Sequence, residues 1–135
     1  MPKPTFTEPQ DVENAFYKAF ETSDLEAMMQ VWLDADYVEC IHPMSHRLMG
    51  TIAIRESWQE IFNNNSAVEF QTVDTRRIEH KDLAVHIVNE HMLVDGDKRV
   101  QILATNIYEK TPDGWRMILH HASPAPKGAV PPTVH

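Results

Sequence analysis

The stretch that decides the fold covers residues 99–123 and reads RVQILATNIYEKTPDGWRMILHHAS. It contains two largely apolar runs of strand length, and the turn signal Pro112-Asp113-Gly114 separates them. A turn this short joins antiparallel strands. The chain upstream repeats the pattern, with Asp95-Gly96-Asp97 as a second turn signal. Four long strands are therefore expected, at Val68–His80, Leu83–Val94, Arg99–Lys110 and Trp115–Ser123.

The first half of the chain has helical spacing instead. Thr7 with Gln10, and Ser23 with Glu26, have the spacing of capping boxes and predict the starts of two helices. A third helix is expected from Thr51, where apolar residues recur every three or four positions up to a run of asparagines.

A short strand is expected between the second and third helices, at residues 37–42, followed by a loop at 44–50. Helices followed by an antiparallel meander indicate an α+β fold with the helices on one face of the sheet. We expect an N-terminal tail at 1–6, one domain at 7–124 and a flexible C-terminal tail at 125–135, which is rich in proline.

Length and charge limit the classes of function. The 135 residues suffice for one domain with its own core. The formal net charge of -8 argues against a nucleic-acid binder, because phosphate contacts need clustered Lys and Arg. No apolar run approaches the roughly 20 residues of a membrane span. Cys40 is the single cysteine and fits a reducing compartment, so the cytoplasm is the expected location.

Two polar clusters interrupt apolar strands far apart in the sequence. In the first, strand alternation puts Cys40 and His42 on one face. His42 either acts as a general acid or base near neutral pH, or simply hydrogen-bonds a loop carbonyl. In the second, the adjacent His120 and His121 point to opposite faces of a regular strand. Alternate residues of this strand form two sets, one for each face of the sheet. The more apolar set, which would normally be buried, contains His121 and so favours His121 inside. A bulge would reverse this assignment.

Asn106 and Tyr108 share one face of an otherwise apolar strand. The Asn106 amide could orient a ligand carbonyl or brace His42 or His121, and satisfaction by a neighbouring loop is at least as good an interpretation. The helical aromatic residues are more often simple core than pocket wall. They are Phe16, Phe20, Trp32, Trp58 and Phe62.

No metal and no cofactor are expected. The eight histidines form no H-E-x-x-H or H-x-H spacing, and His42, His46 and His121 could meet only through the fold. No glycine-rich phosphate loop is present in the sequence. Cys40 fits an inert core thiol better than a nucleophile.

Five short motifs, in order, resemble the SnoaL-like branch of the nuclear-transport-factor-2-like superfamily, also called the cystatin-like cone fold. They are Ser23–Trp32, Cys40–Pro43, Gly50–Trp58, Ala104–Asn106 and Gly114–Ser123. The resemblance spans roughly residues 7 to 124. It implies a strongly curved antiparallel sheet wrapped around three N-terminal helices, with a cavity between them. It also implies a homodimer formed through the outer sheet face.

The resemblance implies a small, partly apolar organic ligand in the cone and cofactor-free acid–base chemistry of the isomerase, cyclase or dehydratase type. His42 would be the general base or acid, with His121 (or His120) and Asn106 as polar anchors. The other ligand-binding candidates are Phe16, Phe20, Trp32, Cys40, Trp58 and Tyr108.

Ketosteroid isomerases of this superfamily use a tyrosine and two aspartates. This chain is expected to differ, because Phe16 takes the tyrosine position and residues 40–42 contain no carboxylate. The alternative function is a non-catalytic dimeric association or ligand-sensing domain in which the histidines are structural.

Overall fold

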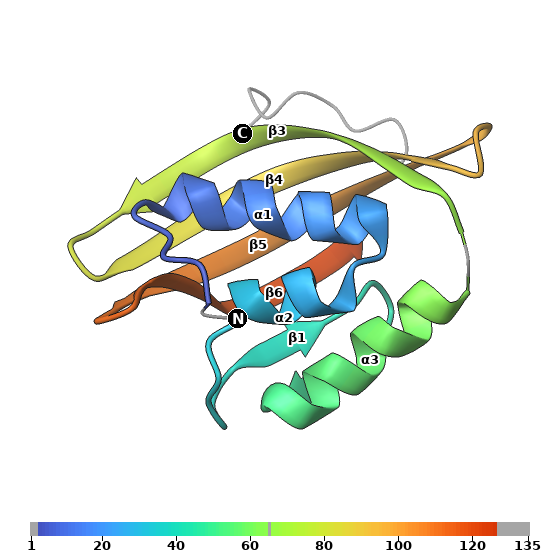
Figure 1. Ribbon diagram of the computed structural model, residues 1–135. Coiled ribbons are helices and arrows are strands. Elements are labelled where there is room, and N and C mark those ends of the chain that lie inside the picture. The colour runs from blue at the N-terminus through green and yellow to red at the C-terminus, as the bar shows by residue number, and fades with distance from the viewer. Residues whose placement is uncertain (1–2, 65, 127–135) are drawn as a thin grey trace.

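The computed structural model describes residues 3–64 and 66–126 and contains three helices on one side of a curved sheet (Figure 1). The helices are α1 (Pro9–Thr22), α2 (Leu25–Val31) and α3 (Thr51–Asn63). The strands are β1 (Glu39–Ile41), β2 (Leu48–Met49), β3 (Val68–Glu79), β4 (Leu83–Val94), β5 (Lys98–Thr111) and β6 (Gly114–Pro124). Within the described residues, no helix is long and apolar enough to cross a membrane.

The six strands form one sheet in the order β2-β1-β6-β5-β4-β3. The meander from β3 to β6 is antiparallel, as the short turns predict. β1 pairs parallel with β6, so the sheet is mixed and not purely antiparallel. The segment expected to be a loop contains β2, which pairs with β1 and extends the edge. The predicted α+β cone fold is confirmed in its helices, its meander and its curvature (Figure 1).

The helix starts differ in detail from the capping boxes expected. Glu8 is the N-cap of α1 without a side-chain cap, and the Thr7 hydroxyl instead donates to Asp11 at 3.2 Å. Asp24 caps α2, because its carboxylate accepts the Ala27 N–H at 3.0 Å. Ser23 lies one residue earlier, in the left-handed conformation that ends α1 (φ 51°). A carboxylate one position later therefore replaces the expected hydroxyl cap.

The core lies between the helices and the concave face of the sheet, and α1 crosses over β4 and β5 (Figure 1). Aromatic rings dominate this core. The largest fully buried side chains include Phe16, Met28, Trp32, Ile54, Trp58, Tyr108 and Met117.

Residues 4–6 are fixed against β6, although a tail was expected there. The Trp115 N–H donates to the Phe6 carbonyl at 2.8 Å, and the Arg116 guanidinium donates to the Pro4 carbonyl at 2.6 Å. Gly114 allows this close approach. At the other end, the Ala125 N–H still pairs with Gln101 at 3.0 Å. The rest of the expected C-terminal tail, residues 127–135, lies outside the described residues.

Candidate functional site

One row of polar side chains crosses the concave face of the sheet. His86 of β4 pairs with Asn106 of β5, Asn106 pairs with His120 of β6, and His120 pairs with Cys40 of β1. All four residues are at most 1% exposed. Buried polar side chains need partners. Their hydrogen bonds therefore define what this row can do.

A hydrogen-bonded chain runs from α1 to β6 through this row. The Tyr17 hydroxyl donates to Glu90 Oε2 at 2.6 Å, and the Asn106 amide donates to the Tyr17 oxygen at 3.1 Å. The Asn106 carbonyl oxygen lies 2.6 Å from Nδ1 of His120. An amide oxygen can only accept, so Nδ1 of His120 carries the proton. We call these four residues, Glu90, Tyr17, Asn106 and His120, the inner chain.

Burial favours the neutral form at both ends of the inner chain. Burial raises the pKa of Glu90 to about 7, against the opposing hydrogen bond from Tyr17. Burial, with a smaller contribution from His42 and His121, lowers the pKa of His120 to about 3. With Nδ1 protonated, a neutral His120 presents Nε2 as a free lone pair that can accept a proton, and its low pKa makes it a weak base.

His42 is a second neutral imidazole, at the end of β1. Burial lowers its pKa to about 4. The Ser57 hydroxyl gives its hydrogen to the Ile54 carbonyl at 2.7 Å and lies 3.0 Å from Nε2 of His42. His42 Nε2 therefore donates to Ser57, and Nδ1 holds the lone pair. Cys40 Sγ lies 3.6 Å from Nε2, but burial raises the pKa of this thiol, so it stays protonated.

Trp58 of α3 packs near both imidazoles. Its ring centroid is 4.8 Å from that of His42 and 6.4 Å from that of His120. Phe16 contacts the His120 ring at 4.8 Å, and Phe20 contacts Trp58 at 4.9 Å. The fold thus brings together most residues expected at the site, from α1, α3, β1, β5 and β6.

The expectation that His121 faces inward is wrong. Ile107 pairs with Leu119 but Tyr108 pairs with Met117, so Ile118 is an extra residue and β6 bulges there. The bulge inverts the alternation that follows it. His120 is 1% exposed inside the cone, whereas His121 is exposed on the outer face. His42, His46 and His121 therefore do not converge.

Trp32 and Tyr108 are buried away from the imidazole pair. Trp32 bridges to Met117, and Tyr108 packs on His86 with ring centroids 5.0 Å apart. Among the described residues, three ring donors are buried without a hydrogen-bond partner: Trp32 Nε1, Trp58 Nε1 and the Tyr108 hydroxyl. Such orphaned donors need an explanation, and a bound polar group or water is the usual one.

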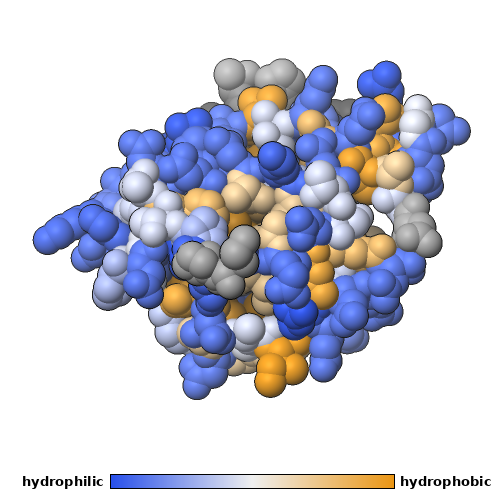
Figure 2. Space-filling model, viewed as in Figure 1, coloured by the Kyte–Doolittle hydropathy of each residue, from blue (hydrophilic) through white to orange (hydrophobic). Residues whose placement is uncertain are grey.

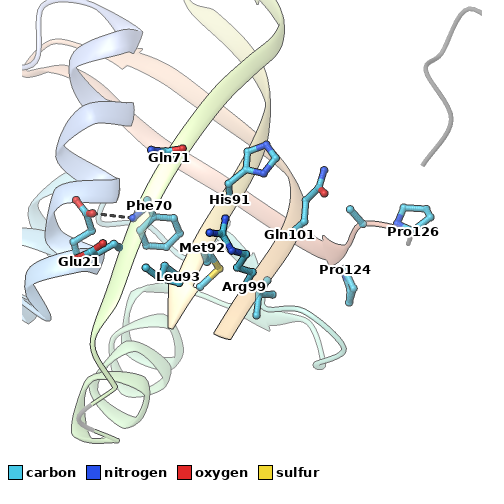
Figure 3. A pocket seen from close by; sticks show the side chains of 13 residues that line it. Glu21, Phe70, Gln71, His91, Met92, Leu93, Arg99, Gln101, Pro124 and Pro126 are labelled. Carbon is cyan, nitrogen blue, oxygen red and sulfur yellow. Dashed lines mark hydrogen bonds between the residues drawn. The ribbon is translucent and has the colours of Figure 1, made fainter. Parts of the chain in front are cut away.

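The space over the imidazoles is filled by the aromatic rings, and a large hollow lies elsewhere. It has a volume of about 1030 Å³ and is lined by the ends of β3, β4 and β5, by Glu21 of α1, and by residues 124–126. Glu21 reaches across to the Phe70 N–H at 2.9 Å, and His91 and Gln101 line the same hollow (Figure 3). Figure 2 shows apolar surface at this end of the strands, at the upper right. Phe70 lines this hollow and also packs on Tyr17, with ring centroids 5.3 Å apart.

Sequence reasoning missed Glu13, Tyr17, His86 and Glu90 as buried polar residues. A signal was present in β4, where alternation places His86 and Glu90 with the buried Ala84 and Val88. In α1, Glu13 and Tyr17 are four residues apart and so share one face.

Comparisons with known proteins agree on one family. A SnoaL-like domain model matches residues 10–127. A solved protein from Thiobacillus denitrificans, provisionally named a calcium/calmodulin-dependent protein kinase type II association domain, is 39% identical, with a TM-score of 0.87 over 91% of this chain and 99% of that one. Another from Streptomyces avermitilis, provisionally named a dehydratase of the NTF2-like family, is 31% identical, with a TM-score of 0.80 over 87% and 93%.

The F-box protein SKIP8 of Arabidopsis thaliana is 34% identical over 114 residues, which are 83% of this chain. The match covers 47% of that protein, so this chain spans about half the length of its curated relative. A ketosteroid isomerase-like protein from Erwinia carotovora is 13% identical with a TM-score of 0.70, which shows a shared fold only. The chain belongs to the SnoaL-like domain family of the NTF2-like, cystatin-like fold.

Proposed function

We propose that this SnoaL-like protein binds a small, partly apolar organic carbonyl compound against the inner face of the sheet and transfers a proton on it. The inner chain is the observation that carries this proposal. Burial keeps His120 neutral, and three other buried polar residues, from α1, β4 and β5, fix its tautomer with Nδ1 protonated and Nε2 as the base. A core built only for stability has little reason to bury so many polar groups.

The proposed reaction starts when Nε2 of His120 takes a proton from the carbon next to the carbonyl group. The Trp58 indole N–H is buried without a partner near the His120 ring, and we assign it as the donor to the oxygen on which negative charge develops. The proton then returns to another carbon, which is an isomerisation, or leaves with a departing hydroxyl group as water, which is a dehydration. Both balance without a cofactor. His42, a neutral imidazole that also packs on Trp58, is the second proton carrier.

Ligand entry requires aromatic side chains to move. Phe16, Phe20 and Trp58 pack over His120, so the ligand has to displace at least one of these rings. This favours a ligand with an apolar body, which replaces the ring contacts it removes. The relative provisionally named a dehydratase supports this class of chemistry.

The adjacent histidines provide a matched test. Small ketones and β-hydroxy ketones are incubated with the protein in D2O, and deuterium incorporation next to the carbonyl is followed by NMR. The wild type and His121→Asn are expected to exchange equally, because His121 is on the outer face. His120→Asn is expected to lose about 100-fold or more of the rate, the usual share of a general base. Equal exchange by the two variants would overturn the assignment of His120.

A second candidate function is association through the outer sheet face, and one observation favours it. Four large apolar side chains are exposed on β3, β4 and β5, between 38% and 55%: Val73, Ile78, Leu83 and Leu103. An apolar sheet face of this kind marks an interface. The relative provisionally named an association domain supports a homodimer as its occupant.

Light scattering coupled to gel filtration tests the homodimer. The wild type is expected at twice the chain mass and Leu103→Asp at the single-chain mass. Ile52→Asp is the control, because Ile52 is 75% exposed on α3, away from the sheet face. A wild-type protein that is monomeric at high micromolar concentration would contradict the association proposal without affecting the acid–base one.

A further inference from the structure

A second polar cluster lies under α1 at the other end of the sheet row. Glu13 of α1, Asp74 of β3 and His86 of β4 each contribute one donor atom, and the three atoms lie within 4.8 Å of one another. Glu13 is 3% and His86 0% exposed. The cluster shares no residue with the inner chain. Its three residues come from three separate elements.

The distances suit one small cation between the three groups. Nδ1 of His86 is 3.0 Å from Glu13 Oε1 and 3.9 Å from Asp74 Oδ2. Donor atoms around a metal at 2.0–2.2 Å lie about 3 to 4 Å apart. An ion bound here would replace the proton that Nδ1 now shares with Glu13.

Each of the three groups has a further partner that orients it. Glu79 Oε2 lies 2.8 Å from Nε2 of His86, so Nε2 donates to a carboxylate. Gln10 donates to the other Glu13 oxygen at 2.8 Å, and Arg77 donates to Asp74 at 2.9 Å. A carboxylate behind a histidine fixes the tautomer that offers the opposite nitrogen to a metal.

The charges also fit a divalent ion. Three carboxylates, those of Glu13, Asp74 and Glu79, surround one imidazole, and Arg77 supplies one positive charge. Both nitrogens of His86 lie against carboxylates, so the ring is charged and the metal-free cluster carries a net charge of about -1. A metal that displaces the Nδ1 proton would meet a net charge of about -2, which is costly without the metal. A bound divalent cation would bring the sum to zero.

Two neighbouring features support a ligand at this point. The Tyr108 hydroxyl is fully buried and makes no hydrogen bond of good geometry, and its ring lies against His86. Burial and then Glu13 raise its pKa, while the nearby Asn106 amide lowers it. A separate hollow of about 300 Å³ is lined by Gln10, Arg77 and Glu79. This hollow therefore lies beside the residues that orient the three proposed ligands.

We propose that Glu13, Asp74 and His86 bind one divalent first-row transition-metal ion, with Glu79 orienting the imidazole from behind. One nitrogen and two carboxylate donors suit Zn²⁺, Mn²⁺ or Co²⁺ better than Mg²⁺ or Ca²⁺, which prefer oxygen alone. The ion would join α1 to β3 and β4 and would satisfy the Tyr108 hydroxyl through a bound water.

The test is calorimetric titration of the metal-free chain with Zn²⁺, and with Co²⁺ read also by its visible absorption. We expect one ion per chain. Asp74→Asn is expected to weaken binding about 100-fold or more, and Glu79→Gln about 10–100-fold, the range for partners behind a ligand. His91→Asn removes an exposed imidazole of β4 and is expected to bind as the wild type does.

Circular dichroism and urea denaturation of each metal-free variant separate lost binding from lost folding. Asp74 and Glu79 are at the edge of the core, so both variants are expected to fold. The proposal is overturned if the wild type binds no ion in a one-to-one ratio. It is equally overturned if Asp74→Asn binds as the wild type does, or if Mg²⁺ competes at the same concentration as Zn²⁺.

Discussion

Replacing Glu90 by glutamine is expected to stabilise the protein at alkaline pH and to leave it nearly unchanged at acidic pH. Glu90 is 2% exposed and its carboxyl accepts the Tyr17 hydroxyl at 2.6 Å. The glutamine side-chain oxygen can accept the same hydrogen bond. The substitution therefore removes the ability to ionise while it keeps the shape and the Tyr17 contact.

The magnitude follows from the pKa of Glu90, which burial raises from 4.5 to about 7. The folded state therefore binds this proton more tightly than the unfolded state does. The free energy of unfolding falls as pH rises from about 4.5 to about 7, and the loss is complete above that window. At 1.36 kcal/mol per pKa unit, the ionised carboxylate costs the fold about 3 kcal/mol at pH 8.

Urea denaturation of both proteins at several pH values between 4.5 and 8 measures this difference. The gain of Glu90→Gln over the wild type is expected to grow from near zero to about 3 kcal/mol across the window. Glu69→Gln, at an exposed position of β3, is the matched control for the substitution itself. A difference that does not change with pH would refute the reasoning that Glu90 is protonated in the fold.

Three further predictions use the same structure. Burial lowers the pKa of His120 to about 3, so the free energy of unfolding falls as the pH drops below 6.5, by up to about 1.4 kcal/mol per pH unit. In urea denaturation at several pH values, His120→Asn is expected to lack this dependence on pH. An unchanged dependence would contradict a neutral His120 in the fold. Gly114→Ala is expected to lower the melting temperature more than Gly96→Ala. Both glycines have positive φ, but a Cβ at 114 would lie 2.8 Å from the Phe6 carbonyl oxygen. Equal losses in melting temperature would mean that residues 4–6 do not pack against Gly114. Cys40, buried with a raised thiol pKa, is expected to react with a disulfide reagent only after denaturation, and prompt labelling of the native protein would be inconsistent with its burial.

The α+β order could be predicted from the sequence because its signals are local. Short turns at Asp95–Asp97 and Pro112–Gly114 dictate antiparallel strands, and apolar spacing marks the helices. The parallel pairing of β1 with β6 has no such signal, since its two partners are about 80 positions apart. Pairing between distant segments depends on the whole fold.

The candidate site likewise has parts with local sequence signals and parts that depend on the whole fold. Asn106, His42 and Trp58 could be selected because polar or aromatic residues at strand and helix positions are visible locally. The inward position of His120 could not be predicted, because one extra residue at Ile118 inverts the alternation. The partners of the buried polar groups join elements far apart in sequence: Tyr17 meets Glu90, and Glu13 meets His86.

The measurement that tests the central claim most directly is nitrogen NMR of the His42 and His120 imidazoles, through their long-range couplings to ring protons. Both rings are expected to stay neutral at pH 5.5, with the proton on Nδ1 of His120 and on Nε2 of His42. A small ketone that binds is expected to shift both rings and to leave His121 unchanged. A His120 ring that titrates near pH 6.5, or that carries its proton on Nε2, would contradict the account of a buried base held by Asn106.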